Sequence, residues 1–192
     1  MTTTNAADPA VSSSWRDAAP SALIDHILAT HHRTTRDELA RLVALGATVR
    51  GLHQDRHPEL ILVEQLIGKL SADLFPHMQK EELILFPFIQ ALEDGTQPPF
   101  GPPSVAMPIG VMNVEHEMVE RLLAELRCVT SGYTIPEDAC VSWRALYDAL
   151  QNFEADLQQH IHLETNVLFP KAMEMEGRWS GVGSRELATR AD

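Results

Sequence analysis

The sequence has few cysteines, few basic residues and no long apolar run. Two cysteines, Cys128 and Cys140, among 192 residues are too few for a disulfide scaffold or a cysteine-built zinc or iron–sulfur site. Lys and Arg total 15 against 27 Asp and Glu, and the resulting net charge of −12 disfavours nucleic acid and anionic membranes as partners. The short apolar runs cannot cross a bilayer. The opening MTTTNAADPAVSSS lacks the features of a secretory signal, so we expect a cytoplasmic protein.

What the sequence does contain is enough apolar material for one ordinary domain. Hydrophobic residues make up 44% of the chain and charged residues 22%, which is typical of a folded globular protein. Residues 1–19, rich in Thr, Ser and Ala, are expected to form a disordered tail. We expect the folded domain to span residues 20–176 and a polar tail to follow over residues 177–192.

The apolar residues between these tails recur at helical spacing. Four patterns are predicted to be helices, over residues 20–52, 59–92, 108–129 and 137–173. Breaks rich in Pro, Gly or polar residues separate them at 54–58, 94–103 and 131–136. No strand-like alternation is present. The sequence therefore predicts an all-α fold, an up-down-up-down four-helix bundle. Pro76, inside the second pattern, should kink that helix or force a wider turn there.

An internal repeat stands out among these helices. Residues 77–87 read HMQKEELILFP and residues 160–170 read HIHLETNVLFP, so both follow His-x3-Glu-x4-Phe-Pro. A His and a Glu four residues apart lie on one face of a helix. A further histidine precedes each motif at a matched distance, His32 by 45 residues and His116 by 44. Each unit therefore offers one His on one helix and a His–Glu pair on the next.

In the first unit, His32 and His77 are also expected to lie at the same level along the bundle. His32 and His77 lie at nearly equal distances, 23 and 22 residues, from a turn centred at Asp55. At about 1.5 Å per residue, both are roughly 34 Å from the turn. The second unit is less symmetric, and an extended connection at about 3.3 Å per residue is needed to level His116 with His160.

Four imidazoles and two carboxylates inside a bundle are costly to bury unless cations satisfy them. A single His-x3-Glu is usually a solvated pair, but two matched copies favour a metal site. Imidazole suits iron, zinc and copper, and carboxylates that bridge two ions favour iron or manganese.

These motifs resemble those of hemerythrin-like di-iron proteins, and most closely the repair-of-iron-centres (RIC) family. The resemblance extends from Trp15 to about Met173 and is most specific in LIDHI (23–27), GVMNVEH (110–116) and the two repeats. It implies two non-haem iron ions bridged by Glu81 and Glu164, with His32, His77, His116 and His160 as the other ligands. Longer RIC proteins carry a preceding domain with adjacent cysteines, and this chain resembles the short form without it.

The resemblance also implies a role in nitrosative or oxidative stress. The expected functions are binding or reduction of nitric oxide at the iron pair, supply of iron to damaged iron–sulfur centres, or both, which leaves open whether the chain is an enzyme. The alternative is an oxygen carrier or sensor like the hemerythrins, with O₂ as the diatomic ligand. True hemerythrins have two histidines four residues apart on helix three. Here Glu120 follows His116 at that spacing, which favours reactivity.

Three further residues are candidates near the metals. Asp73, four residues before His77, and Glu115, beside His116, are expected to orient a ligand or pass protons. The family has a histidine matching His53, but His53 lies about 31 Å along the helix from His32. We therefore place His53 outside the ligand set. The pattern does not indicate an electron donor or an oligomeric state.

Overall fold

The computed structural model describes residues 15–96, 98 and 103–189, with residues 180–189 described by their backbone alone. Every regular element within these residues is helical. In chain order the elements are α2 (Pro20–His26), η1 (Ile27–His32), α3 (Arg33–His53), α4 (Glu59–Lys80), η2 (Glu81–Leu85), α5 (Phe86–Glu93), α6 (Ala106–Val129), α7 (Val141–Leu163), η3 (Glu164–Leu168) and α8 (Phe169–Thr189). The three η elements are wide turns of π-helix.

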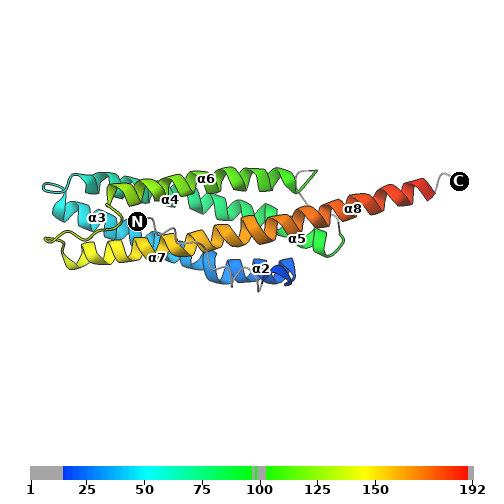
Figure 1. The fold of residues 1–192 in the computed structure, drawn as a ribbon, viewed down its shortest axis with the longest axis horizontal. Coiled ribbons are helices and arrows are strands. Elements are labelled where there is room, and N and C mark those ends of the chain that lie inside the picture. Colours follow the sequence, from blue (N-terminus) through cyan, green and yellow to red (C-terminus); the bar gives the residue numbers. More distant parts are fainter. Residues whose placement is uncertain (1–14, 97, 99–102, 190–192) are drawn as a thin grey trace.

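These elements join into four long helices that form an up-down-up-down bundle, as the sequence predicts (Figure 1). The first consists of α2, η1 and α3, the second of α4, η2 and α5, the third of α6, and the fourth of α7, η3 and α8. The helix α3 packs against α4 and α7, and α4 packs against α6. No helix in the described ranges combines the length and the apolar character that a transmembrane span needs.

The fourth helix differs from its prediction at both ends. It begins at Val141 and continues to Thr189, past Met173, so that α8 projects beyond the other helices (Figure 1). Glu176 anchors this continuation, because its carboxylate accepts hydrogen bonds from the Ser104 hydroxyl at 2.8 Å and the Val105 amide at 2.7 Å. Residues 177–189, expected in a polar tail, are therefore helical, and residues 190–192 lie outside the described residues.

The segment before α2 is also more ordered than predicted. The Trp15 ring stacks on His26, and the Lys171 ammonium donates hydrogen bonds to the carbonyl oxygens of Trp15 and Ala18. Residues 15–19 are thus held against the bundle. Residues 1–14 of the expected tail lie outside the described residues.

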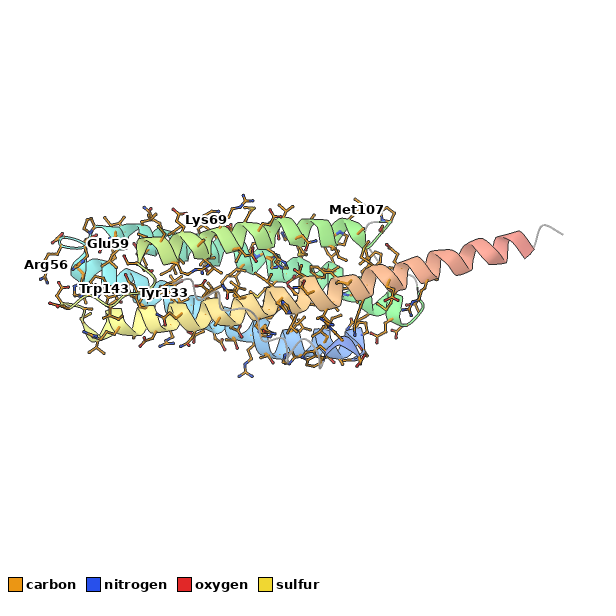
Figure 2. The ribbon with its side chains drawn as sticks, in the orientation of Figure 1. Arg56, Glu59, Lys69, Met107, Tyr133 and Trp143 are labelled. Atoms are coloured by element: carbon orange, nitrogen blue, oxygen red, sulfur yellow. The ribbon has the colours of Figure 1, made fainter. Side chains whose placement is uncertain are left out.

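The bundle interior has two apolar clusters. The turn cluster lies toward the ends of α3 and α7 that carry the short connections, and its members include Leu39, Leu42, Leu60, Leu70, Leu74, Val119, Leu126, Trp143, Phe153 and Leu157. The loop cluster lies at the opposite end and includes Ile24, Ile27, Leu85, Phe86, Ile89, Ile109, Met112, Leu163 and Phe169. Figure 2 shows Trp143 and Tyr133 at the first end and Met107 at the other. On every long helix, a buried polar layer separates the two clusters.

Candidate metal centre

The six residues singled out by the repeat form this polar layer. They come from all four long helices, and none has more than 4% of its surface exposed. His32 is the last residue of η1, whereas Glu81 and Glu164 are the first residues of η2 and η3. The remaining ligand candidates are His77 in α4, His116 in α6 and His160 in α7.

The donor atoms of these residues converge into two overlapping groups. The first position consists of His32, His160, Glu81 and Glu164, and the second position of His77, His116 and the same two glutamates. Within each group, one donor atom from every residue lies within 4.8 Å of all the others. Both groups therefore have the size of a single-cation site.

Each shared carboxylate presents one oxygen to each position. Glu81 Oε2 lies 3.3 Å from His32 Nε2, and Glu81 Oε1 lies 3.2 Å from His77 Nε2. Glu164 repeats the arrangement, with Oε1 at 3.0 Å from His160 Nε2 and Oε2 at 3.2 Å from His116 Nε2. This is the arrangement expected of a carboxylate that bridges two cations.

Several of these atoms are buried with no hydrogen-bond partner among the described residues. Both oxygens of Glu81, Glu164 Oε2 and His32 Nε2 are in this state. An unsatisfied buried polar atom costs free energy, and its presence calls for an ion or another partner. Imidazole nitrogens and carboxylate oxygens are suitable donors for a transition metal. The residues present therefore fit a pair of metal ions.

Two of the three wide turns of π-helix, η2 and η3, have a cause in the repeat itself. Pro87 and Pro170 follow the phenylalanine of each motif, and proline has no amide proton to donate within a helix. One residue before each proline, the amides of Phe86 and Phe169 donate to the carbonyls of Glu81 and Glu164, five residues earlier. Such π-turns are common at functional sites. The sequence predicts a wider turn at Pro76, but η2 begins five residues later, at Glu81.

The two phenylalanines of the repeat also cover the histidines. Phe86 stacks on His32 with ring centroids 5.6 Å apart, and Phe169 stacks on His116 at 6.0 Å. Both rings belong to the loop cluster, so they close the polar layer from that side.

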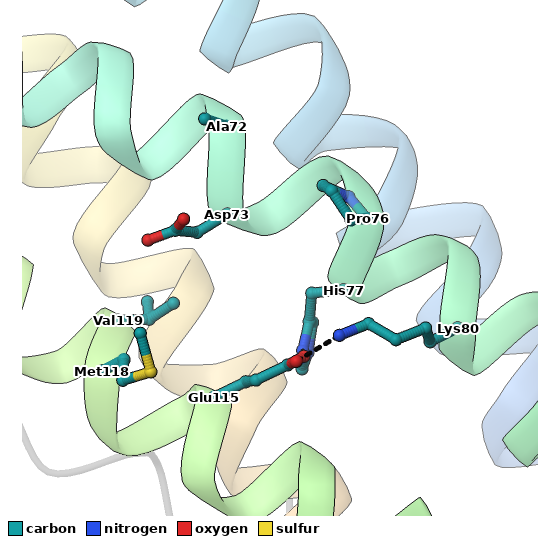
Figure 3. Close-up of a pocket in the computed structure, with 8 residues that line it drawn as sticks. All are labelled: Ala72, Asp73, Pro76, His77, Lys80, Glu115, Met118 and Val119. Carbon is teal, nitrogen blue, oxygen red and sulfur yellow. Dashed lines mark hydrogen bonds and ion pairs between the residues drawn. The ribbon is translucent and has the colours of Figure 1, made fainter.

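Side chains outside these six residues contact the Nδ1 atoms of three of the histidines. Glu82 Oε1 lies 2.7 Å from His32 Nδ1 and is paired with Arg36. Glu115 Oε2 lies 2.9 Å from His77 Nδ1 and is paired with Lys80 (Figure 3). Thr165 Oγ1 lies 3.3 Å from His116 Nδ1. Contacts of this kind fix the orientation of a ligating imidazole and raise its basicity.

The charged groups in the polar layer shift the pKa values of their neighbours. Burial lowers the pKa of His77, but the close contact with the Glu81 carboxylate, the charge of Glu164 and the hydrogen bond to Glu115 outweigh burial and raise it to about 9. Burial likewise lowers the pKa of His32, but its contacts with Glu81 and Glu82 raise it overall. Burial raises the pKa of Glu164, but the charges and close contacts of His160 and His116 hold it well below the usual range.

Two hollows lie beside the second position. A cavity of about 200 Å³ adjoins His77 and is lined by Ala72, Asp73, Pro76, Lys80, Glu115, Met118 and Val119 (Figure 3). A more polar one of about 380 Å³ adjoins His116 and is lined by Asn113, Glu117, Glu120, Ile161, Thr165 and Asn166. Both are large enough for a diatomic molecule.

The remaining sequence candidates have different outcomes. Glu115 contacts His77 across the helix pair, not the neighbouring His116. Asp73 lines the cavity but pairs with Lys69, at 2.9 Å. His53 packs against Trp143 at the other end of α3, and neither group of donor atoms among the described residues includes it. Sequence reasoning missed Glu82 and Thr165, although each directly follows a glutamate of the repeat.

A four-helix bundle with two overlapping His/Glu groups at its centre defines a hemerythrin-type cation-binding domain. The family model "Hemerythrin HHE cation binding domain" matches residues 23–172. The chain belongs to this family and, within it, to the repair-of-iron-centres group, as its curated relatives show.

Those relatives are bacterial. The chain is 38% identical to the probable iron-sulfur cluster repair protein of Haemophilus influenzae over 83% of its own length and 68% of the relative. It is 36% identical to the iron-sulfur cluster repair protein YtfE of Enterobacter sp., over 87% of this chain and 72% of the relative. The protein of the same name from Escherichia coli O1:K1 is 35% identical, with the same coverage.

Proposed function

We propose that the chain holds two iron ions, one at each position, bridged by Glu81 and Glu164. The observation that carries this proposal is that each carboxylate offers one oxygen to the first position and the other to the second. His32 and His160 would complete one iron site and His77 and His116 the other. Bridging carboxylates combined with imidazoles favour iron or manganese, and the names of the relatives favour iron.

The function that this centre supports best is repair of iron–sulfur proteins after nitrosative or oxidative stress. The chain would bind or reduce nitric oxide, supply iron to damaged iron–sulfur centres, or do both. Bound ferrous iron supplies an open coordination position and an electron for a diatomic ligand. Relatives named as iron-sulfur cluster repair proteins support this proposal, and damaged iron–sulfur proteins are the partners it requires.

The protein's own residues prepare the site for this chemistry. Glu115 and Glu82 orient His77 and His32 through their Nδ1 atoms, so that the Nε2 atoms face Glu81. The turn and loop clusters keep water away from both ends of the polar layer. The cavities beside His77 and His116 provide an approach for a small ligand to the second position.

An oxygen carrier of the hemerythrin type has less support. Glu120, at the place where true hemerythrins have a second histidine on helix three, lies on the surface and lines the hollow beside His116. Only two imidazoles then serve each iron. The centre is therefore open to reaction rather than saturated by nitrogen ligands.

We also propose a cytoplasmic location. Cys128 and Cys140 are both free thiols. Unpaired cysteines fit a reducing compartment.

An anaerobic titration of the reduced, iron-loaded protein with nitric oxide tests the function. A nitrosyl spectrum followed by nitrous oxide would support reduction, and a nitrosyl spectrum alone would support binding. A second arm mixes the loaded protein with a nitric oxide-damaged iron–sulfur enzyme and measures recovery of that enzyme. Absence of both the nitrosyl spectrum and the recovery would overturn the proposal.

A further inference from the structure

A column of four aromatic rings leads from the edge of the bundle to the first position. Trp15 stacks on His26 with centroids 4.7 Å apart and planes 25° from parallel. His26 meets the edge of His31 at 5.5 Å, and His31 lies parallel to His160, also at 5.5 Å. Burial increases along this ring column, from half-buried Trp15 and His26 to His31 at 4% exposure and His160 at 1%.

Three separate parts of the fold hold the ring column in place. Lys171, from α8, binds the backbone carbonyls on either side of the turn that follows Trp15. The Thr30 hydroxyl lies 3.4 Å from His26 Nδ1, and Asp156 Oδ1, from α7, lies 3.0 Å from His31 Nδ1. The rings are therefore fixed by specific contacts and do not merely fill space.

The internal repeat shows what is unusual about His31. His31 precedes His32 just as Glu115 precedes His116, so the two residues occupy matching places in the two units. Glu115 accepts a hydrogen bond from a ligand histidine of the second position. His31 instead lays its ring flat against His160, whose Nδ1 has no hydrogen-bond partner among the described residues. At this matching place, the first position thus has a ring, His31, and the second position has an orienting carboxylate, Glu115.

From this arrangement we infer that the ring column carries electrons from a one-electron donor at the Trp15 surface to the iron pair. The inference rests on the proposed iron centre. Each donor molecule loses one electron, and one Fe³⁺ becomes Fe²⁺, so two donors reduce the pair. The electron tunnels, so no ring is oxidised and no bond forms or breaks. Rings form the path because contiguous π-systems couple donor and acceptor better than saturated side chains do.

The electron path and the approach of a dissolved ligand lie on different sides of the centre. The two hollows adjoin His77 and His116, so a dissolved ligand approaches the second position. The ring column ends at His160, so electrons arrive at the first position from the opposite ligand set. A one-electron carrier that docks at Trp15 need not enter either hollow.

Stopped-flow reduction of the oxidised, iron-loaded protein by reduced methyl viologen tests the route. His26→Leu keeps the volume and removes the ring, and it should slow reduction by about tenfold, equivalent to about 1.4 kcal/mol of barrier. His26→Phe restores a ring and should stay within about threefold of the parent rate. Trp15→Ala should slow reduction like His26→Leu. His162→Leu and Trp179→Ala, outside the ring column, are matched controls that should keep the parent rate.

Two results would overturn the inference. If the leucine and phenylalanine variants both keep the parent rate, electrons enter elsewhere, and if both slow equally, His26 acts through packing. Iron content, measured for every variant, separates this test from that of the proposed function. A parent chain without iron contradicts the iron centre, whereas an iron-loaded chain whose reduction rate does not depend on the His26 ring contradicts only the ring column.

Discussion

The two positions of the centre share their carboxylates but differ in what surrounds them. At the first position, His32 contacts Glu82, which is paired with Arg36, and His160 contacts the ring of His31. At the second position, His77 contacts Glu115 and His116 contacts Thr165. Two hollows adjoin these histidines. A repeated motif can therefore build a symmetric ligand set while its neighbours make the two positions chemically unequal.

Removing the shared residues should have the largest effect. The double change Glu81→Ala with Glu164→Ala takes a ligand pair from both positions, so iron content should fall from near two per chain to near zero. Metal analysis of protein from iron-replete cells measures this. Cys128→Ser with Cys140→Ser is the control and should keep its iron. Full iron retention in the glutamate double variant would disprove the bridging assignment.

Removing the metal should destabilise the chain without unfolding it. A cation bound only by the folded state contributes about 4 kcal/mol when its free concentration is about a thousand times its dissociation constant. Two such cations contribute about 8 kcal/mol, so at about 2–4 °C per kcal/mol for a chain of this size Tm should fall by roughly 20 °C. Circular dichroism with and without chelator under reducing conditions measures the shift. An unchanged Tm after iron loss would mean that the metal is not held between helices.

Changes to the outer carboxylates should separate the two positions. Glu115→Gln should weaken metal binding at the second position by about 10–100-fold, because His77 loses a charged partner. Glu82→Gln should do the same at the first position, through His32. Competition with a chelator, followed spectroscopically, should show that each variant loses one of two ions more readily. Equal weakening of both ions in either variant would show that the positions act as one unit.

The smallest expected effect lies far from the metals, at the turn end. His57 Nε2 lies 3.1 Å from Asp138 Oδ1, and His57 Nδ1 lies 3.0 Å from Glu59. The hydrogen bond to Asp138 and the contact with Glu59 raise the pKa of His57 above 6.5 despite slight burial. The pair therefore stabilises the folded chain fully below pH 6.5, and this stabilisation is lost as pH rises through the raised pKa.

Asp138→Asn tests this pair. The variant should be slightly less stable than the parent in urea at pH 6, and the difference should be smaller at pH 9, where Asp138 keeps only its exposed contact with Arg56. Because both side chains are near the surface, solvent weakens the effect. A difference that is larger at pH 9 than at pH 6 would contradict the pairing.

The sequence predicts the helices, and which residues share a helix face, because both depend on spacing along one helix. The face that His77 and Glu81 share follows directly from their separation of four residues. The partners outside the six depend instead on how helices meet. Glu115 neighbours His116 in sequence yet contacts His77 on another helix, and Asp73 pairs with Lys69.

Helix ends and wide turns were harder to predict for related reasons. Residues 177–189 are small and polar, and the contacts that anchor α8 at Glu176 are tertiary. The π-turns η2 and η3 follow from Pro87 and Pro170, but interpreting their motif as a metal site alone does not predict them. His31 is buried and contacts Asp156, which lies 125 residues away in the chain.

The polar layer between the two apolar clusters also bears on cooperativity. Two apolar cores that a layer of polar side chains separates need not unfold together, so each can open by itself. Amide protons in α5 and the first turns of α6, which pack in the loop cluster, should then exchange faster than those of α3 in the metal-free chain. Binding of two cations to ligands from all four helices would join the clusters into one unit, and exchange at both ends should slow together. The metal centre would thus set the size of the region that unfolds as a whole.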